Sequence, residues 1–224
     1  MHLLFLAIAP VAVVILYIYF KDKYEKEPIK TVAISFLLGA TASLLITVII
    51  SSIVSIFIPL TDAKSIFQQF IKAFVLVALV EEFSKYIIVK YYAQKNKEFN
   101  EPFDGIVYAV MVSMGFAALE NILYTFQYGF GVGVTRAFTA VPAHAIFGII
   151  MGYFVGKAKF SNKSVKLNLL GLLFATLFHG FYNFFLFIYF IPGIYIGVFV
   201  SLLIVVILSK KAIYRHQNST SFKV

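Results

Sequence analysis

The chain of 224 residues is 61% hydrophobic and only 13% charged, and it contains no cysteine. Soluble domains carry about 25% charged residues, so this composition excludes an ordinary soluble protein and indicates a polytopic membrane protein. The lack of cysteine excludes disulfides, thiolate nucleophiles and cysteine-ligated metals. A net charge of +9 would suit nucleic-acid binding, but basic residues in a membrane chain mark cytoplasmic loops, and we expect no nucleic-acid partner.

Seven apolar stretches follow one another along the chain, and each is long enough to cross a bilayer as a helix. The connections between them are short and leave no room for a separate soluble domain. We therefore expect an all-α, polytopic membrane helical bundle of about seven transmembrane helices, with one domain over residues 1–209 and a basic, disordered cytoplasmic tail over 210–224. The predicted spans cover residues 3–20, 31–58, 67–92, 104–128, 137–156, 167–190 and, after a turn at 192–193, a last stretch ending near 209.

Lysine and arginine are distributed unevenly over the connections. Fifteen of the 19 lie in the first, third and fifth connections and in the tail, whereas the opposite side holds only Lys64 and Arg136. Cytoplasmic loops carry the excess of basic residues, so we expect the N-terminus outside and the C-terminus in the cytoplasm. The first apolar stretch is followed, not preceded, by charges, which indicates an uncleaved span rather than a signal peptide.

The third apolar stretch contains Glu81, Glu82 and Lys85 within five residues. One charge at the centre of a membrane helix costs about 2.5–3.5 kcal/mol on insertion scales, so three of them must face the protein interior or a wet cavity. Ionisable groups in such a position indicate a functional site. Glu81 and Lys85 are four residues apart and therefore share one face of the helix.

Three later stretches also carry polar groups that lipid would not accept: Glu120, His144, and the pair His179 and Asn183. At 1.5 Å per residue from the cytoplasmic ends, Glu81 lies at a depth of about 15 Å, the two histidines at about 18–20 Å, and Glu120 and Asn183 at about 24 Å. All of these depths fall between the middle of the membrane and its outer third. The helices can therefore bring these side chains together.

The fifth stretch has a second signal, since small residues recur every four positions on the face that carries His144. A stripe of small residues lets neighbouring helices approach closely and marks a buried face. His144 is therefore expected to point inward, either into the site or into the packing between helices. The stripe consists of Ala140, His144, Gly148, Gly152 and Gly156.

Each polar pair has a catalytic and a structural interpretation. Glu81 or Glu82 can act as a general base that activates water, or Glu81 can form a structural ion pair with Lys85. His179 and Asn183 can donate hydrogen bonds to a developing oxyanion, or they can hold two helices together. Glu120 can share the water or tune the first carboxylate.

Two further polar residues favour structural roles, and a metal is not favoured. Asn121 is expected to form a hydrogen bond between helices. Asp104 is expected to cap the fourth helix, because aspartate is a preferred N-cap residue. The sequence contains no H-E-x-x-H motif, and two separated histidines would have to recruit glutamates from other helices to bind zinc.

The order of these motifs resembles the PrsW family of bacterial membrane proteases, which is related to the type II CAAX prenyl proteases and to the Aph subunit of γ-secretase. The sequence EEFSK at 81–85 fits the EExxK motif of the family. The other matching segments are DGIVY at 104–108, GFAALENILY at 115–124, HAIFGIIMG at 144–152 and HGFYN at 179–183.

The resemblance implies proteolysis within the membrane by a glutamate-activated water, with no covalent intermediate, no metal and no other cofactor. The substrate class that it implies is a membrane-anchored anti-sigma factor, cut on its extracytoplasmic side in regulated intramembrane proteolysis during a stress response. Glu81 matches the water-activating glutamate, and Glu120 stands where CAAX proteases have a histidine that shares the water. His179 and Asn183 match the pair that holds the oxyanion.

Two departures qualify the resemblance. Lys85 stands where the CAAX enzymes have arginine, which favours the PrsW type over prenyl-protein processing. Asn183 stands where some relatives have aspartate, and because an amide cannot act as a base we expect it to form hydrogen bonds only.

The sequence thus predicts a multi-pass protease of the bacterial plasma membrane that acts on a membrane-anchored protein within the lipid bilayer. The alternative is a non-catalytic membrane scaffold, as the Aph subunit is thought to be, or a proton-coupled transporter of the same fold. Transporters commonly show internal repeats and broken helices, and neither is evident here. The predicted catalytic residues are Glu81, Glu82, Glu120, His144, His179 and Asn183.

Overall fold

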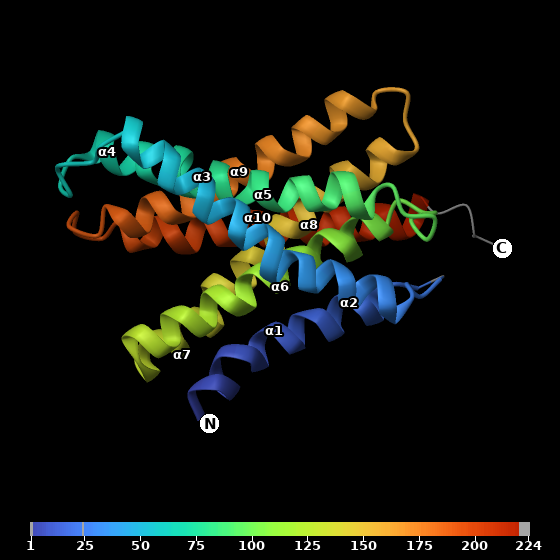
Figure 1. Ribbon diagram of the computed structural model, residues 1–224, viewed down its shortest axis with the longest axis horizontal. Helices are drawn as coiled ribbons and strands as arrows, with labels where there is room; N and C mark the ends of the chain where they lie inside the picture. Colours follow the sequence, from blue (N-terminus) through green and yellow to red (C-terminus); the bar gives the residue numbers. More distant parts are fainter. Residues whose placement is uncertain (1, 24, 220–224) are drawn as a thin grey trace.

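The computed structural model describes residues 2–23 and 25–219, and these residues form helices joined by short connections, with no strand among them (Figure 1). Segments labelled η are π-helical turns that continue an adjoining α-helix. The elements are α1 (His2–Lys21), α2 (Ile29–Leu38), η1 (Gly39–Ser43), α3 (Leu44–Phe57), α4 (Ile66–Ile71), η2 (Lys72–Leu79), α5 (Val80–Ile88), η3 (Val89–Ala93), α6 (Asp104–Tyr128), α7 (Phe130–Phe138), α8 (Ala140–Lys159), α9 (Ser164–Phe187) and α10 (Tyr195–Ser219).

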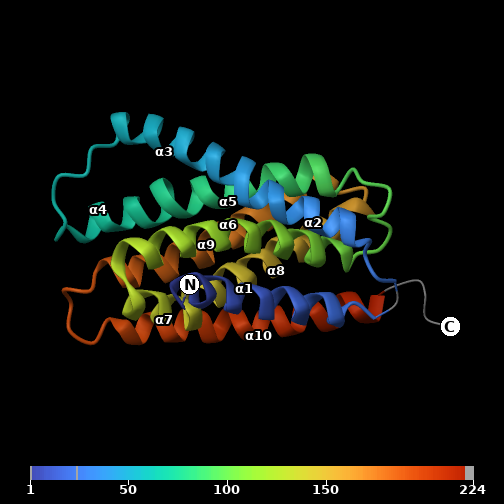
Figure 2. The ribbon, with the colours of Figure 1, turned by 60° about the horizontal axis from the view of Figure 1, so that its bottom comes forward.

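Seven helical segments of the described chain run side by side as a membrane-spanning bundle (Figure 2). Six of them are long and apolar enough to cross a membrane by composition alone. The remaining one is the continuous helix from α4 to η3, whose charges lower its hydropathy although its length is sufficient. The predicted all-α membrane bundle of about seven helices is therefore confirmed.

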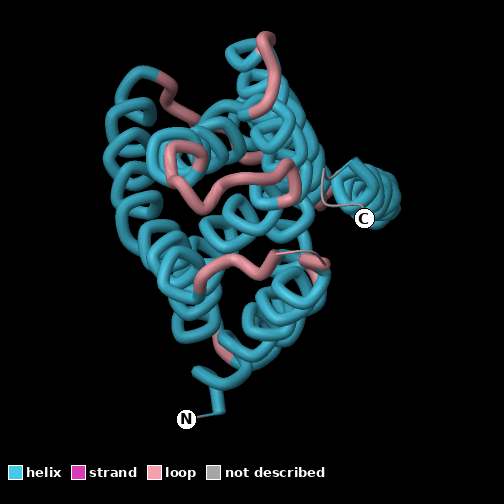
Figure 3. The backbone as a smooth tube through the Cα atoms, turned by 90° about the vertical axis from the view of Figure 1, so that its right-hand side faces the viewer, coloured by secondary structure: helices cyan, strands magenta, loops and turns pink. Residues whose placement is uncertain are grey.

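The basic connections gather at one end of the bundle. The loops that follow α1, η3 and α8 all lie at the end where the described chain terminates (Figure 2). Figure 3 looks along the bundle from that end and shows the connections that cross it. This arrangement agrees with the uneven distribution of lysine and arginine, and the orientation with the N-terminus outside stays a prediction from that distribution.

Helix α6 is the central element of the bundle, and glycines let its neighbours approach closely. A Cβ atom added to Gly105 would lie 2.5 Å from the carbonyl oxygen of Gly152 on α8, and one added to Gly115 would lie 1.9 Å from the carbonyl oxygen of Phe36 on α2. Real Cβ atoms do not approach other atoms so closely, so only glycine fits at these positions. The predicted close packing along the small-residue stripe of α8 is confirmed.

Two boundaries differ from the expectation. Residues 129–136 lie between the predicted fourth and fifth spans, and the predicted fifth span begins at 137, but residues 130–138 form helix α7, which breaks from α8 at Thr139. The last helix does not end near 209 but continues to Ser219, because Ala212, Ile213 and His216 pack against the bundle and are buried. The expected disordered tail is therefore wrong for residues 210–219, and residues 220–224 lie outside the described part.

Candidate active site

Helix α5 presents its carboxylates to the interior because its other face is bonded to the second span. The hydroxyl of Ser84 lies 2.8 Å from that of Ser43 and 2.7 Å from that of Thr47, and all three side chains are buried. The π-helical segment η2 directly precedes α5, and such wide turns occur frequently at functional sites. This attachment fixes the rotation of the helix that carries Glu81 and Glu82.

Lys85 is the cation at the centre of the site, and its side chain is 1% exposed. Its Nζ atom donates to Oε1 of Glu82 at 2.8 Å and lies 3.5 Å from Oε2 of Glu81. It also lies 3.3 Å from Nδ1 of His144 and 4.3 Å from the ring centre of Phe116. The predicted ion pair between Glu81 and Lys85 is present, but Glu82 is the closer partner.

The second partner of Glu82 is His179 on α9. The Nδ1 atom of His179 lies 2.9 Å from Oε1 of Glu82, so it donates its proton to that carboxylate. The ring of His179 stacks on Phe147 at a centroid distance of 4.9 Å. These contacts fix the orientation of the imidazole and direct its Nε2 atom toward Glu81, whose Oε2 lies 4.0 Å away.

Glu120 on α6 is held by two donors from the following helices. Its Oε2 atom lies 2.9 Å from Nε2 of His144 and 2.8 Å from Nη2 of Arg136. Arg136 extends from α7 and also donates from Nε to the amide oxygen of Asn121 at 3.0 Å. Asn121 in turn donates to the carbonyl of Ala7 at 2.9 Å, so its predicted hydrogen bond between helices is confirmed.

Arg136 belongs to the site although the sequence interpretation placed it in an extracytoplasmic connection. The signal that could have found it is its isolation, since only one other basic residue was counted on that side of the membrane. An arginine that is 15% exposed beside a carboxylate that is 18% exposed requires such a partner. Helix α7 thus places the guanidinium of Arg136 inside the bundle.

The polar groups converge on one point. A carboxylate oxygen of Glu81, one of Glu120 and a ring nitrogen of His144 all lie within 4.8 Å of one another. They line a cavity of about 550 Å³ toward the end of the bundle opposite the basic connections, and His179 and Asn183 lie on its wall. Five of the six predicted site residues are therefore joined in one network, while Asn183 lines the cavity and has no hydrogen bond to the network within the described chain.

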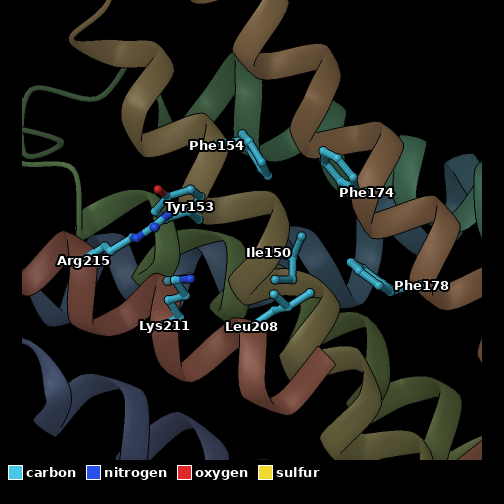
Figure 4. Close-up of a pocket in the computed structure, with 9 residues that line it drawn as sticks. Ile150, Tyr153, Phe154, Phe174, Phe178, Leu208, Lys211 and Arg215 are labelled. Atoms are coloured by element: carbon cyan, nitrogen blue, oxygen red, sulfur yellow. The ribbon is translucent and has the colours of Figure 1, made fainter. Parts of the chain in front are cut away.

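A second cavity, of about 260 Å³, lies between α8, α9 and α10 near the basic end of the bundle (Figure 4). Its walls are aromatic and aliphatic, with Lys211 and Arg215 at one side. None of the residues that line it is a carboxylate or a histidine. This cavity therefore lacks the kinds of groups that make up the site around Glu81.

Asp104 belongs to a separate carboxylate cluster at the basic end. Its Oδ2 atom accepts from the backbone amides of Asn100 and Glu101, both at 2.7 Å, so it binds the preceding loop and the predicted helix cap is wrong. The hydroxyl of Tyr108 donates to Glu27. Burial and the neighbouring Asp104 raise the pKa of Glu27 to about 9.

The buried carboxylates and histidines converge in a cavity inside the membrane bundle. Such an arrangement is a feature of a hydrolase that works inside the bilayer. A profile described as PrsW family intramembrane metalloprotease matches residues 27–209. The chain belongs to this family, and it is a protease and a multi-pass protein of the bacterial cell membrane.

Curated relatives agree over most of their length. The chain is 44% identical to a protein named Protease PrsW from Oceanobacillus iheyensis, over 80% of each chain. It is 37% identical to Protease PrsW of Geobacillus kaustophilus, over 86% of this chain and 83% of the relative, and 38% identical to that of Bacillus subtilis, over 80% of each. No solved structure matches the chain.

The family description implies a metal, and Glu81, Glu120 and His144 are the residues whose ligand atoms lie near enough to one another to be considered for one. The ammonium of Lys85 can only donate, so its contact with Nδ1 of His144 leaves the ring proton on Nε2, where it is donated to Glu120. That nitrogen then has no lone pair for a metal. Lys85 and Arg136 also place two positive charges beside the carboxylates. In this arrangement the donor set does not fit a metal ion.

Proposed function

We propose that the protein hydrolyses a peptide bond in or next to the membrane-spanning segment of a membrane-anchored protein, with a water molecule activated by Glu81. The observation that carries the proposal is the convergence of Glu81, Glu120, His144 and His179 on one point of a cavity inside the membrane. A membrane-anchored anti-sigma factor is the substrate class that the family resemblance implies.

Glu81 is the better base of the two adjacent glutamates. Glu82 is fully buried and its Oε1 atom is already bound by Lys85 and His179. Glu81 is 8% exposed and lines the cavity, whereas Glu82 is not among the residues that line it. A carboxylate that lines the cavity can accept a proton from water, which is the requirement for a general base.

The reaction follows from these positions. Water lies between Glu81 and Glu120, transfers a proton to Glu81, and its oxygen attacks the carbonyl carbon of the scissile bond. With both ring nitrogens protonated, His179 donates Nδ1–H to Glu82 and Nε2–H to the oxyanion, and the amide of Asn183 donates a second hydrogen bond. The proton on Glu81 then passes to the departing amine as the carbon–nitrogen bond breaks.

The remaining residues position the reacting groups. Glu82 orients the ring of His179, as carboxylates orient histidines in many sites. His144 and Arg136 hold Glu120 on the opposite side of the water. Lys85 compensates the charge of the two adjacent glutamates, which could not both stay ionised in the bundle without it.

The test is cleavage of a single-span anti-sigma factor co-expressed with the protein. Glu81→Gln keeps the shape of the side chain and removes the base, so the cleavage rate should fall by about 10²–10⁴-fold. His179→Ala should also abolish the fragment, whereas Glu98→Gln, at an exposed loop glutamate, should leave it unchanged. Fragment formed at the normal rate by Glu81→Gln and His179→Ala would instead favour the non-catalytic scaffold or the transporter.

A further inference from the structure

A lysine that the mechanism does not use lines the catalytic cavity. Lys72 is half-buried, begins η2 and lines the cavity together with Glu81 and Glu120. Its backbone lies about 9 Å along the helix from the first residue, Ile66, at the usual rise per residue. A cation at such a depth is costly and indicates function.

Within the described chain no carboxylate forms an ion pair with Lys72. Its contact is the ring of Phe187, whose centre lies 4.6 Å from Nζ. The other cation of the cavity wall, Arg136, is bound to Glu120. The carboxylates of the wall are Glu81 and Glu120, and both belong to the catalytic network. Lys72 therefore presents a positive charge to the cavity that is not compensated by an ion pair.

We propose that Lys72 and Phe187 form a substrate-binding subsite for an acidic side chain. The inference rests on the proposed proteolytic function and adds a substrate preference to it. An aspartate or glutamate of the bound segment would pair with the ammonium of Lys72, and its methylene groups would lie against the ring of Phe187. A carboxylate that enters the membrane pairs with a cation more readily than it stays alone.

The position of the acidic residue in the substrate follows from two helices. Residues 72 and 81 are nine positions apart on one helix, but residues 72–79 are π-helical, so the separation is better taken from α9. Residues 179 and 187 are eight positions apart on α9, which runs in the opposite direction, and this corresponds to about 12 Å. An extended peptide advances about 3.3 Å per residue, so the acidic side chain lies about four residues from the scissile bond.

The direction along the substrate is also defined. Lys72 lies toward the end of the bundle opposite the basic connections, which is the extracytoplasmic end under the predicted orientation. The acidic residue therefore belongs to the extracytoplasmic flank of the scissile bond. If Lys72 instead extended outward to lipid phosphates, as lysines near helix ends do, its replacement would have the same effect on every substrate.

The experiment uses purified full-length protein in lipid vesicles and a single-span substrate that it cleaves. Aspartate or asparagine is placed in turn at each of the first eight positions outside the cleavage site. For the wild type, aspartate near the fourth position should raise the rate relative to asparagine by about tenfold or more. Lys72→Gln should abolish this preference, so that the aspartate and asparagine substrates are cleaved at equal rates, and Lys72→Glu should prefer lysine at the same position.

Lys64→Gln is the matched control, because Lys64 is exposed on the same side of the membrane and outside the cavity. It should keep the preference of the wild type. An equal rate for aspartate and asparagine at every position, or a preference that survives Lys72→Gln, would overturn the subsite while leaving proteolysis intact. Full cleavage by Glu81→Gln would overturn the proposed function itself, so the two failures are distinguishable.

Discussion

Replacing Lys85 with methionine removes the charge at the centre of the site and keeps nearly the same volume. In the native chain its ammonium binds Glu82 at 2.8 Å and lies 3.5 Å from Glu81. Glu82 is fully buried, so water cannot reach its carboxylate once the lysine is gone. The remaining donor to Glu82 is His179, at 2.9 Å.

The magnitude follows from the burial of the pair. Removing one partner of a buried ion pair costs about 3–5 kcal/mol, because an uncompensated charge stays in a medium of low dielectric constant. The double variant Lys85→Met with Glu82→Gln removes that charge, and the glutamine oxygen can still accept the proton of His179. We expect the double variant to recover about 1–3 kcal/mol of the loss, since the two residues are in direct contact.

The assay is equilibrium unfolding by a denaturing detergent in mixed micelles, followed by circular dichroism, with cleavage measured on the same samples. The single variant should be strongly destabilised and the double variant partly restored, while both lose activity. A single variant as stable as the wild type would refute the reasoning that Lys85 compensates Glu82. A double variant no more stable than the single one would refute it equally.

Three further predictions concern other parts of the structure. Glu27→Gln should raise the melting temperature at pH 8 but not at pH 4.5. The unfolded chain loses the Glu27 proton above about pH 4.5, whereas the folded chain loses it only near pH 9. The free energy of unfolding of the wild type therefore falls as the pH rises between these values, by at most about 1.4 kcal/mol per pH unit. Gly105→Ala should cost about 1–3 kcal/mol in the same unfolding assay because its Cβ would meet the backbone of α8, whereas Gly131→Ala, with open space around it, should be neutral. Metal-free protein, prepared with a chelator and checked by elemental analysis, should retain its cleavage rate, and recovery only on adding zinc would show that a metal takes part.

Local sequence was sufficient for several features of the site. Helix periodicity places Glu81 and Lys85 on one face, and the contact between them is present at 3.5 Å. The cost of charge in lipid required these residues to point inward, and the depth calculation placed Glu120, His144 and His179 between the middle of the membrane and its outer third. The small-residue stripe of α8 predicted close packing, because the side chains themselves set how near two helices can approach.

Partner choice within the site was decided by tertiary structure. The sequence allowed Lys85 to pair with Glu81, but the rotation of α5, fixed by the hydroxyl of Ser84, brings Glu82 closer. The contact of Glu82 with His179 joins residues 97 positions apart, which no helical periodicity can specify.

The roles of Arg136 and Lys72 also depended on the tertiary structure. Arg136 reaches Glu120 only because residues 130–138 form a helix that turns back into the bundle. Lys72 lines the catalytic cavity beside Phe187 of α9, a neighbour that helix periodicity could not specify. Hydropathy and helix periodicity determined which residues enter the membrane and which share a helix face, whereas the relative rotation and depth of packed helices determined which polar groups meet.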